Sequence, residues 1–380
     1  MLKSARRARG AATVVSLMLA LAGLPAAAQQ AGVAALPATP LLETTRDGQD
    51  LNFDLVFDNP GDQALTLVGL EATWYDAQGH FLGQRRLDQS GSDTTMGILT
   101  VPNRTLPAHG RLVVFNPFQH FRASLQLRDV RYAAVFTTGA EDAPEQRVEL
   151  RLAPAVFVPR TRLVLPVAGT SFVHDGHDLG SHHRRLDITG DMTTHFGIAA
   201  NVTRYAHDFC VTDDQGRLFR SDGATPEDWY GFGAPIVATG DGVVADVSDG
   251  MPDNRKGAPP AFERAEVMQN LKLLLGNYVI LNHGNGEFSL FAHLRQGSVR
   301  VKAGQQVARG EALGQMGMSG DAFLVHLHYQ LQAGDGFNNE GFPAIFEGVQ
   351  FATGSGWSPA RTSAVDSGDV VRSIPAAGTP

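Results

Sequence analysis

The sequence predicts a mainly β protein with two domains. Its 380 residues include 42 Gly and 20 Pro, which favour short strands and many turns over long helices. Several stretches alternate apolar and polar residues with a period of two, the pattern of half-buried strands. A chain of this length with 43% hydrophobic and 18% charged residues is globular and long enough for two cores.

The first 28 residues predict a secretory signal. Basic residues end at Arg9, an apolar stretch follows over 11–24, and small residues at 26–28 suit a cleavage site. The apolar stretch is short for a membrane span of about 20 residues and is followed closely by Pro25. We therefore expect cleavage after residue 28, no transmembrane segment in the mature chain, and a periplasmic or secreted protein.

The net charge limits the kinds of partner that the chain can bind, and the cysteine content limits how its fold is stabilised. The 31 Lys and Arg against 39 Asp and Glu give a formal charge of −8, which argues against a nucleic-acid partner because such a partner requires a basic face. Cys210 is the only cysteine, so no intrachain disulfide can form and stability must come from packing. We expect Cys210 to be a buried apolar thiol rather than a metal ligand.

The N-terminal region predicts a β-sandwich. Residues 29–41 are rich in Ala, Pro and Gln and predict a linker. From residue 51 the pattern alternates, with Leu51, Phe53, Leu55 and Phe57 on one face. Further strands are expected over 65–75, 80–86, 110–115, 130–136 and 148–152. Their lengths and spacing predict an immunoglobulin-like sandwich over 42–155, a spacer or binding module through which a protein partner could bind.

Histidines concentrate in the C-terminal region, predicted as a domain over 156–345 with a C-terminal extension over 346–380. Ten of the 13 lie between His174 and His328, more than core packing requires. In the alternating stretch 325–331, His326 and His328 project to the same face of a strand. Such a pair can bind a metal, or divide into one ligand and one acid/base, although a surface or core pair is the plainer alternative.

Other segments frame these histidines. A strand over 204–209 leads through 233–247 into an insertion over 250–275, in which residues 259–275 predict one amphipathic helix. The chain returns in a buried strand over 276–284, and a further strand over 288–294 carries His293.

Several motifs together resemble the lysostaphin/LytM-type zinc endopeptidases over roughly residues 165–335. They are Gly276-Asn277-Tyr278-Val279-Ile280, Phe291-Ala292-His293-Leu294, the Gly-rich stretch 297–307, Gly317-Met318-Ser319-Gly320 and His326-Leu327-His328. The resemblance implies a mostly antiparallel sheet with a groove, one zinc ion, and cleavage of peptide bonds in peptidoglycan. It implies nothing about residues 29–155.

Site residues follow from the same resemblance. It implies that His328 is a metal ligand and that the neighbouring His326 is catalytic. His293 matches a second catalytic histidine, with Phe291 where the family has Tyr, and Asp208 matches the carboxylate ligand.

The first histidine ligand departs from the usual pattern. Most members carry it four residues before the Asp, where this chain has Arg204. A subgroup has a distant His-Arg-Arg loop, which 183–185 resembles, so His183 is the expected first ligand. Asp187 also lies four residues after His183, but we expect the strand ending at Asp208 to supply the carboxylate.

Other histidines remain open as the first ligand. His182 and His195 both lie in nearby loops, and His207 would point away from Asp208 in a regular strand.

This ligand set predicts a reaction. Two imidazoles and one carboxylate leave a tetrahedral zinc with an open position, as in catalytic sites. Zinc lowers the pKa of its water toward ~7 and polarises the scissile carbonyl. His293 and His326 can then handle the proton and stabilise the oxyanion. We expect a peptidoglycan endopeptidase using a metal-activated water. The alternatives are a zinc-free LytM-like regulator of another cell-wall hydrolase and a zinc hydrolase of other extracellular peptides.

Overall fold

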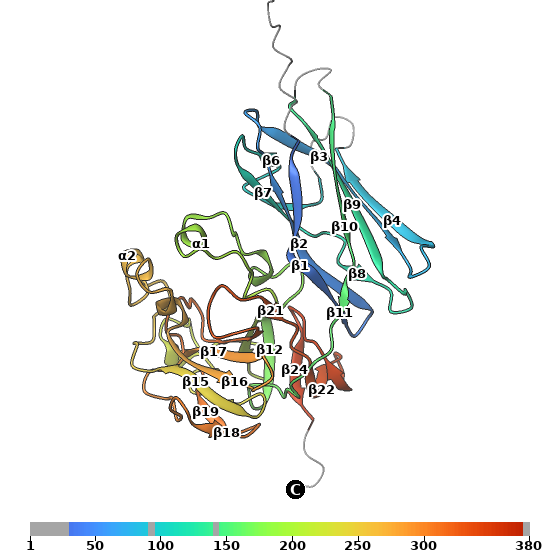
Figure 1. Ribbon diagram of the computed structural model, residues 1–380. Helices are drawn as coiled ribbons and strands as arrows, with labels where there is room; N and C mark the ends of the chain where they lie inside the picture. The colour runs from blue at the N-terminus through green and yellow to red at the C-terminus, as the bar shows by residue number, and fades with distance from the viewer. Residues whose placement is uncertain (1–29, 90–95, 140–143, 375–380) are drawn as a thin grey trace, which may run out of the picture.

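The computed structural model describes residues 30–89, 96–139 and 144–374 and is mainly β, as predicted. Figure 1 shows two lobes, with strands β1 to β10 in the upper one and β12 to β24 in the lower one. The predicted signal over residues 1–28 lies outside the described residues. In the described part of the chain, no helix has both the length and the apolar character needed to cross a membrane.

Two sheets form the upper lobe. The first has the order β11-β1-β2-β7-β5, with β8 also pairing with β2. Its strands are β1 (Gly32–Thr44), β2 (Gln49–Asp58), β5 (Leu99–Val101), β7 (Arg111–Phe115), β8 (His120–Phe121) and β11 (Ala155–Val156). The second has the order β10-β9-β3-β4, with β6 on β3. Its strands are β3 (Leu65–Tyr75), β4 (Phe81–Asp88), β6 (Thr105–Leu106), β9 (Asp129–Thr137) and β10 (Gln146–Leu152).

The alternating residues of β2 form the centre of this lobe. Leu51, Phe53, Leu55 and Phe57 are at most 1% exposed and belong to one core with residues of the second sheet. The predicted inward face of this strand is therefore confirmed. We refer to this lobe, residues 30–156, as the sandwich domain.

The linker predicted over 29–41 is wrong for most of its length. Residues 32–44 form β1, which pairs antiparallel with β2. The prolines that made this stretch resemble a linker lie where the register shifts, between Leu36 and Leu41. Because the ladder is interrupted there, their missing N–H groups cost no strand hydrogen bond.

The lower lobe is built on one large sheet with the order β18-β15-β16-β17-β20-β13-β12-β24-β22-β23, and β21 also pairs with β20. Its strands are β12 (Thr170–Asp175), β13 (His207–Val211), β15 (Gly242–Ser248), β16 (Asn277–Asn282), β17 (Phe288–Leu294), β18 (Gln306–Val307), β20 (Leu327–Gln332), β21 (Gly341–Phe342), β22 (Phe346–Ala352), β23 (Trp357–Ser363) and β24 (Val370–Ser373). A separate pair joins β14 (Pro235–Val237) to β19 (Ala312–Gln315).

The segment predicted as a C-terminal extension belongs to this sheet instead. Strand β24 pairs with β12 and β22 pairs with β24. Phe346, Val349 and Val371 are completely buried in the main core of the lobe. Strands β24, β22 and β23 thus continue the sheet past β12 and share its core, so the domain extends to at least residue 373.

The lower lobe also contains short helices, of which the η elements are 3₁₀ helices. They are η1 (His183–Arg185), α1 (Asp191–His195), η2 (Pro226–Asp228), α2 (Arg264–Val267) and η3 (Leu271–Leu275). The single helix predicted over 259–275 is thus wrong, because it divides into α2 and η3. Asn270 accepts a hydrogen bond from the backbone N–H of Lys272 and so begins a new helix. Val267, Leu271 and Leu275 are still buried, as the amphipathic pattern required.

Candidate metal centre

Three neighbouring strands bring the predicted site residues together. In the ladder between β13 and β20, Asp208 is the direct partner of His328. On the other side of β20, Ala292 of β17 pairs with His328, which places the next residue, His293, at the same level. Because opposite residues of antiparallel strands lie about 5 Å apart, this register groups the carboxylate and the imidazoles on one face.

Three imidazole nitrogens converge on one carboxylate oxygen. The Oδ1 of Asp208 lies 3.3 Å from Nδ1 of His328, 3.4 Å from Nε2 of His326 and 3.7 Å from Nε2 of His183. All four side chains are at most 8% exposed. Among the described residues, this buried Oδ1 has no hydrogen-bond partner. A buried oxygen surrounded by imidazole nitrogens yet without a hydrogen bond is an arrangement that suits the binding of a cation.

Hydrogen bonds on the outer side of each ring orient His328, which lies in β20, and His326, which directly precedes this strand. Nε2 of His328 lies 2.8 Å from Oε1 of Gln330, and Nδ1 of His326 lies 3.0 Å from the carbonyl of Leu324. Each outer nitrogen faces an acceptor and therefore carries the proton, which leaves a lone pair on the inner nitrogen. Metal-binding histidines are commonly fixed in this way.

His293 reaches the site through an unusual backbone conformation. Its φ is +60°, directly after the last pair between β17 and β20, and such left-handed geometry is uncommon outside glycine and frequent at functional sites. Its Nδ1 donates to the carbonyl of Ser319 at 2.8 Å. Its ring centroid lies 4.7 Å from that of His326 and 5.8 Å from that of His328.

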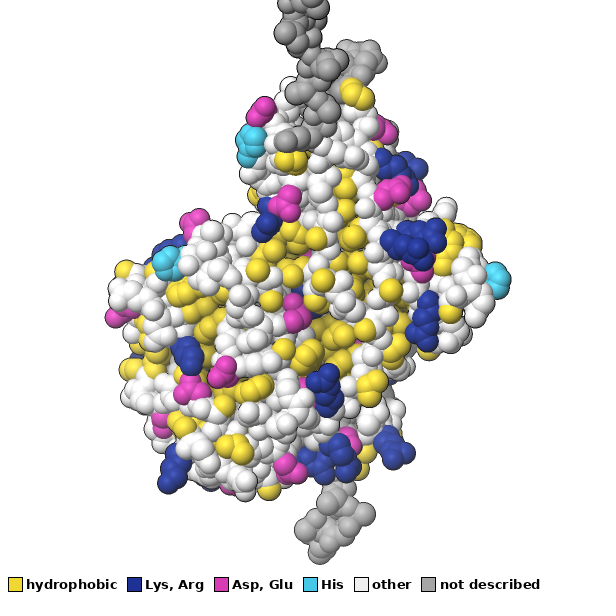
Figure 2. Space-filling model, in the orientation of Figure 1, with side chains coloured by type: hydrophobic (Ala, Val, Ile, Leu, Met, Phe, Trp, Pro, Cys, Tyr) yellow, Lys and Arg dark blue, Asp and Glu magenta, His cyan; other side chains and the backbone are white. Residues whose placement is uncertain are grey.

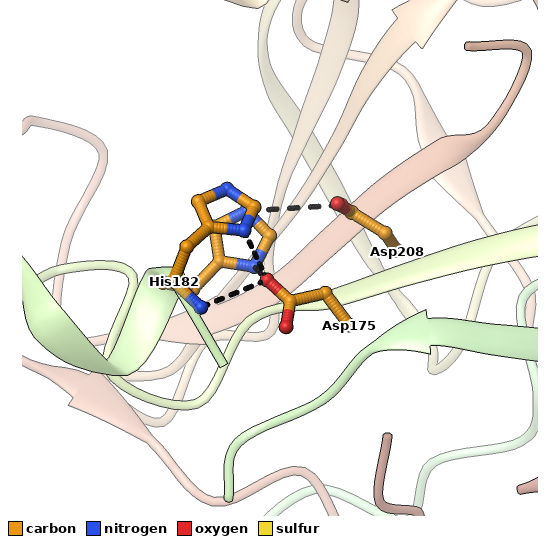
Figure 3. A group of neighbouring side chains, drawn as sticks. Asp175, His182 and Asp208 are labelled. Atoms are coloured by element: carbon orange, nitrogen blue, oxygen red, sulfur yellow. Dashed lines mark hydrogen bonds and ion pairs between the residues drawn. The ribbon is translucent and has the colours of Figure 1, made fainter. Parts of the chain in front are cut away.

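His183 enters from η1, outside the sheet. Its carbonyl accepts hydrogen bonds from the side chains of Asn201 and Thr203, which hold the helix next to the turn before β13. Its Nδ1 lies 3.2 Å from Oδ2 of Asp175 without forming a hydrogen bond, and its Nε2 lies on the side of Asp208. Figure 3 shows Asp175 and Asp208 approaching the imidazole rings of this loop from different sides.

The protonation states suit a cation. Burial lowers the pKa of His183 to about 3 and lowers the pKa values of His293 and His326. Burial alone would raise the pKa of Asp208, but the surrounding imidazoles hold it well below its ordinary value. At neutral pH these three imidazoles are therefore neutral and lie beside a carboxylate, and both kinds of group are ligands that zinc accepts.

The competing histidines lie elsewhere or are held differently. His182 is 60% exposed and forms an ion pair with Asp175. His195, at the end of α1, contacts the carbonyl of Met268, and His207 points to the opposite face and contacts the carbonyl of Val365. The structure thus places His183, rather than His195 or His207, beside Asp208.

Two residues near the site were missed in the sequence. Gln330 was detectable, because it follows His326 and His328 at the same period of two on one face of the strand. Asp175 gave no signal, since an irregular loop separates it from His183. The donor atoms of Asp175, His182, His183 and Asp208 all lie within 4.8 Å of one another.

Cys210 lies two residues after Asp208 but takes no part in this group. It is completely buried in the apolar core of the lobe, and burial raises the pKa of its thiol. The predicted apolar role of Cys210 is confirmed.

A cavity of about 280 Å³ opens beside the histidines. His183, His293 and His328 line one end of it. The rest is mostly apolar and includes Leu271 and Leu275 of η3. The insertion over 250–275 therefore supplies a wall of the space next to the candidate metal centre.

Comparison with known proteins finds a family model and a relative that match part of this chain. Residues 229–339 match the model of peptidase family M23, a stretch that includes His293, His326 and His328 but not His183 or Asp208. The peptidoglycan DD-endopeptidase ShyA of Vibrio cholerae is 33% identical over 100 residues. The match covers 26% of this chain and only 18% of that relative.

Solved structures that the comparison finds similar to this chain include two peptidases. The catalytic domain of the antimicrobial peptidase lysostaphin from Staphylococcus simulans is 18% identical, with 45% of this chain and 84% of that chain covered and a TM-score of 0.23. A zinc-containing peptidase from Vibrio cholerae is 15% identical, with coverages of 77% and 79% and a TM-score of 0.26. The stretch that matches the model of peptidase family M23, residues 229–339, lies entirely within the lower lobe.

Proposed function

We propose that this chain is a zinc-dependent endopeptidase that cleaves peptide bonds in the stems or cross-bridges of peptidoglycan. The observation that carries the proposal is the convergence of three imidazole nitrogens, from two separate segments, on Oδ1 of Asp208, which is buried and lacks a hydrogen bond. The family M23 match and the similarity to a peptidoglycan endopeptidase support the same activity.

Three residues would hold the metal: His183 through Nε2, Asp208 through its carboxylate and His328 through Nδ1. Three protein ligands leave one position for solvent or substrate, as in catalytic zinc sites. When bound, zinc supplies a Lewis acid that polarises a carbonyl and lowers the pKa of water toward ~7.

His293 and His326 would carry out the proton transfers. Ser319 and Leu324 accept the Nδ1 protons of these two histidines, so each presents an unprotonated Nε2 toward the site. Such a nitrogen can take a proton from the attacking water and return it to the leaving amine. The protonated ring can then stabilise the negative charge that develops on the scissile carbonyl oxygen.

The cavity supports the proposed substrate, and the N-terminal segment supports the proposed location. The cavity is large enough for part of an extended peptide, and its apolar wall suits small aliphatic side chains. A peptidoglycan substrate requires a protein outside the cytoplasm, as the basic and apolar N-terminal segment also predicts.

Digestion of purified peptidoglycan by the purified full chain tests the proposal. We expect soluble muropeptides with newly cleaved peptide bonds, loss of activity with a chelator and recovery with zinc. Cleavage of a peptide panel but not of cell wall would favour a hydrolase of other extracellular peptides. A chain that binds no zinc under zinc-replete conditions and digests nothing would favour the regulator of another hydrolase.

A further inference from the structure

Both faces of strand β2 are buried, although a sandwich can cover only one of them. Leu51, Phe53 and Leu55 fill the sandwich core, while the alternate residues Asn52 and Asp54 are 1% and 2% exposed. These polar side chains point toward the lower lobe. Figure 2 shows hydrophobic side chains gathered on the face where the two lobes meet.

An apolar cluster joins the lobes beside this strand. Val56, Val113 and Phe115 of the sandwich domain pack against Ile188, which lies three residues after η1. Leu186 also packs there. The loop that carries His183 is therefore packed between the sandwich domain and the sheet of the lower lobe.

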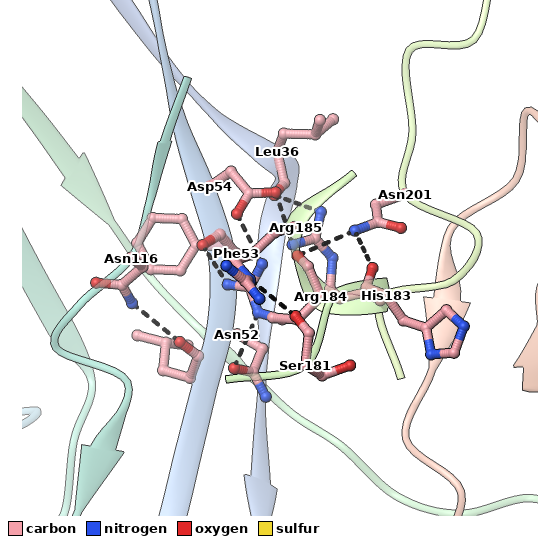
Figure 4. Close-up of polar contacts among 12 residues, drawn as sticks. Leu36, Asn52, Phe53, Asp54, Asn116, Ser181, His183, Arg184, Arg185 and Asn201 are labelled. Carbon is pink, nitrogen blue, oxygen red and sulfur yellow. Dashed lines mark hydrogen bonds and ion pairs between the residues drawn. The ribbon is translucent and has the colours of Figure 1, made fainter. Parts of the chain in front are cut away.

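The side chain of Arg184, the residue next to His183, is held by three acceptors of the sandwich domain. Its Nη1 donates to Oδ1 of Asp54 at 2.7 Å, its Nη2 to the carbonyl of Phe53 at 2.8 Å and its Nε to Oδ1 of Asn52 at 3.3 Å. The guanidinium is completely buried. Figure 4 shows these contacts together with the imidazole of His183 on the opposite side of η1.

The other oxygen of the same carboxylate holds the segment before β13. Nη1 of Arg204 donates to Oδ2 of Asp54 at 2.8 Å, and its Nη2 donates to the carbonyl of Leu36 at 3.0 Å. Arg204 is completely buried and also pairs with Glu340. It lies four residues before Asp208, in the turn that leads into the strand of that ligand.

One sandwich carboxylate therefore bridges the two segments that bring His183 and Asp208 together. We infer that Asp54 is a positioning residue of the metal centre, so that docking of the sandwich domain and binding of zinc are coupled. This inference rests on the proposed function. Without Asp54, the buried guanidinium of Arg204 keeps only the carboxylate of Glu340, and that of Arg184 keeps only the neutral acceptors Asn52 and Phe53. The segment η1 and the turn before β13 then lose their common anchor.

The coupling is reciprocal on thermodynamic grounds. If docking of the sandwich domain holds the ligands in place, zinc must in turn strengthen docking by the same factor. A contact that served stability alone would leave the affinity for zinc unchanged.

Zinc affinity of the full chain, measured by competition with a chromophoric chelator, tests the inference. Asp54→Asn is expected to weaken zinc binding about 10- to 100-fold, the range found when partners of metal ligands are removed. The matched control is Asp129→Asn. Asp129 is also a buried sandwich carboxylate that bridges two arginines, Arg131 and Arg151, but it lies away from the lower lobe. Its substitution should leave zinc affinity unchanged.

The outcomes separate the two hypotheses. If the wild-type chain binds no zinc, the proposed function fails. If the wild-type chain binds zinc and folded Asp54→Asn binds it equally well, the inference is overturned while the proposed function stands.

A milder variant and an unmodified chain cover the case in which Asp54→Asn does not fold. Arg184→Lys keeps the positive charge but loses the planar fork that reaches three acceptors, so zinc binding should again weaken. In the wild-type chain, zinc should slow hydrogen exchange in β1 and β2 as well as in residues 176–204. Unchanged exchange in β1 and β2, or wild-type zinc affinity in Arg184→Lys, would overturn the inference.

Discussion

Each imidazole of the candidate metal centre is held by a different outer partner. His328 contacts the side chain of Gln330, His293 the carbonyl of Ser319, and His183 the carboxylate of Asp175. The hydrogen bonds of His328 and His293 place protons on their outer nitrogens, so their inner nitrogens are available without reorganisation. The division into ligands and acid/base residues can be tested one side chain at a time.

His328→Ala should abolish stoichiometric zinc binding, because His183 and Asp208 alone form a weak two-ligand remnant. The measurement is the zinc content of the purified chain after dialysis against a zinc buffer. His195→Ala is the control, since this histidine lies at the end of α1 and contacts a backbone carbonyl. Loss of zinc in the control, or its retention in His328→Ala, would show that the ligand set is wrong.

His293→Ala should retain zinc but lose about 10² to 10⁴ in turnover, the usual contribution of a general acid/base or oxyanion contact. Zinc content and the rate of peptide cleavage are measured on the same preparation. A folded variant without zinc would instead make His293 a ligand.

Gly276 connects η3 to the strand below the site. It has a φ of +66°, and a Cβ there would lie 2.5 Å from the carbonyl carbon of Ser319, the residue that fixes His293. Gly276→Ala should therefore lower the free energy of unfolding by about 1–3 kcal/mol beyond the cost of the left-handed backbone, and should reduce turnover. Chemical denaturation and a cleavage assay measure both effects.

Gly284→Ala is the matched control for that substitution. Its φ is +78°, but no atom lies within 4 Å of the added Cβ. It should lose only the backbone contribution, about 1 kcal/mol, and keep full turnover. Equal losses in the two variants would mean that the close approach of Gly276 to Ser319 has no effect on the site.

At the level of elements, periodicity predicted the strands and failed where other contacts decided the structure. The alternation over 51–57 identified β2, and the spacing of His326 and His328 identified their common face. The helix expected over 259–275 is interrupted because Asn270 begins a new helix, a local hydrogen bond that the apolar pattern does not reveal. Strand β1 was missed because its prolines suggested a linker.

At the scale of the whole molecule, the sandwich domain is more than a spacer. The contact between Asp54 and Arg184 joins residues 130 positions apart. In the sequence, Asn52 and Asp54 are simply the polar positions of an alternating strand, and such positions normally face solvent. Only the fold shows that they meet Arg184 and Arg204, so this part of the site could not be predicted from the sequence.

The isolated lower lobe, residues 156–374, should keep the core of its sheet but bind zinc more weakly than the full chain. Without the sandwich domain, Arg184 loses all three of its acceptors and Ile188 loses its apolar cover. Hydrogen exchange in residues 176–204 should accelerate, while exchange in β16 and β17 should remain slow. Identical zinc affinity and exchange in the two chains would contradict the role given to the sandwich domain.

The most direct test of the whole account is a crystal structure of the zinc-loaded full chain with anomalous data at the zinc edge. We predict one anomalous peak in the lower lobe, about 2.0–2.2 Å from Nε2 of His183, a carboxylate oxygen of Asp208 and Nδ1 of His328. A peak bound instead by His195 or His293, or no peak near Asp208, would contradict it.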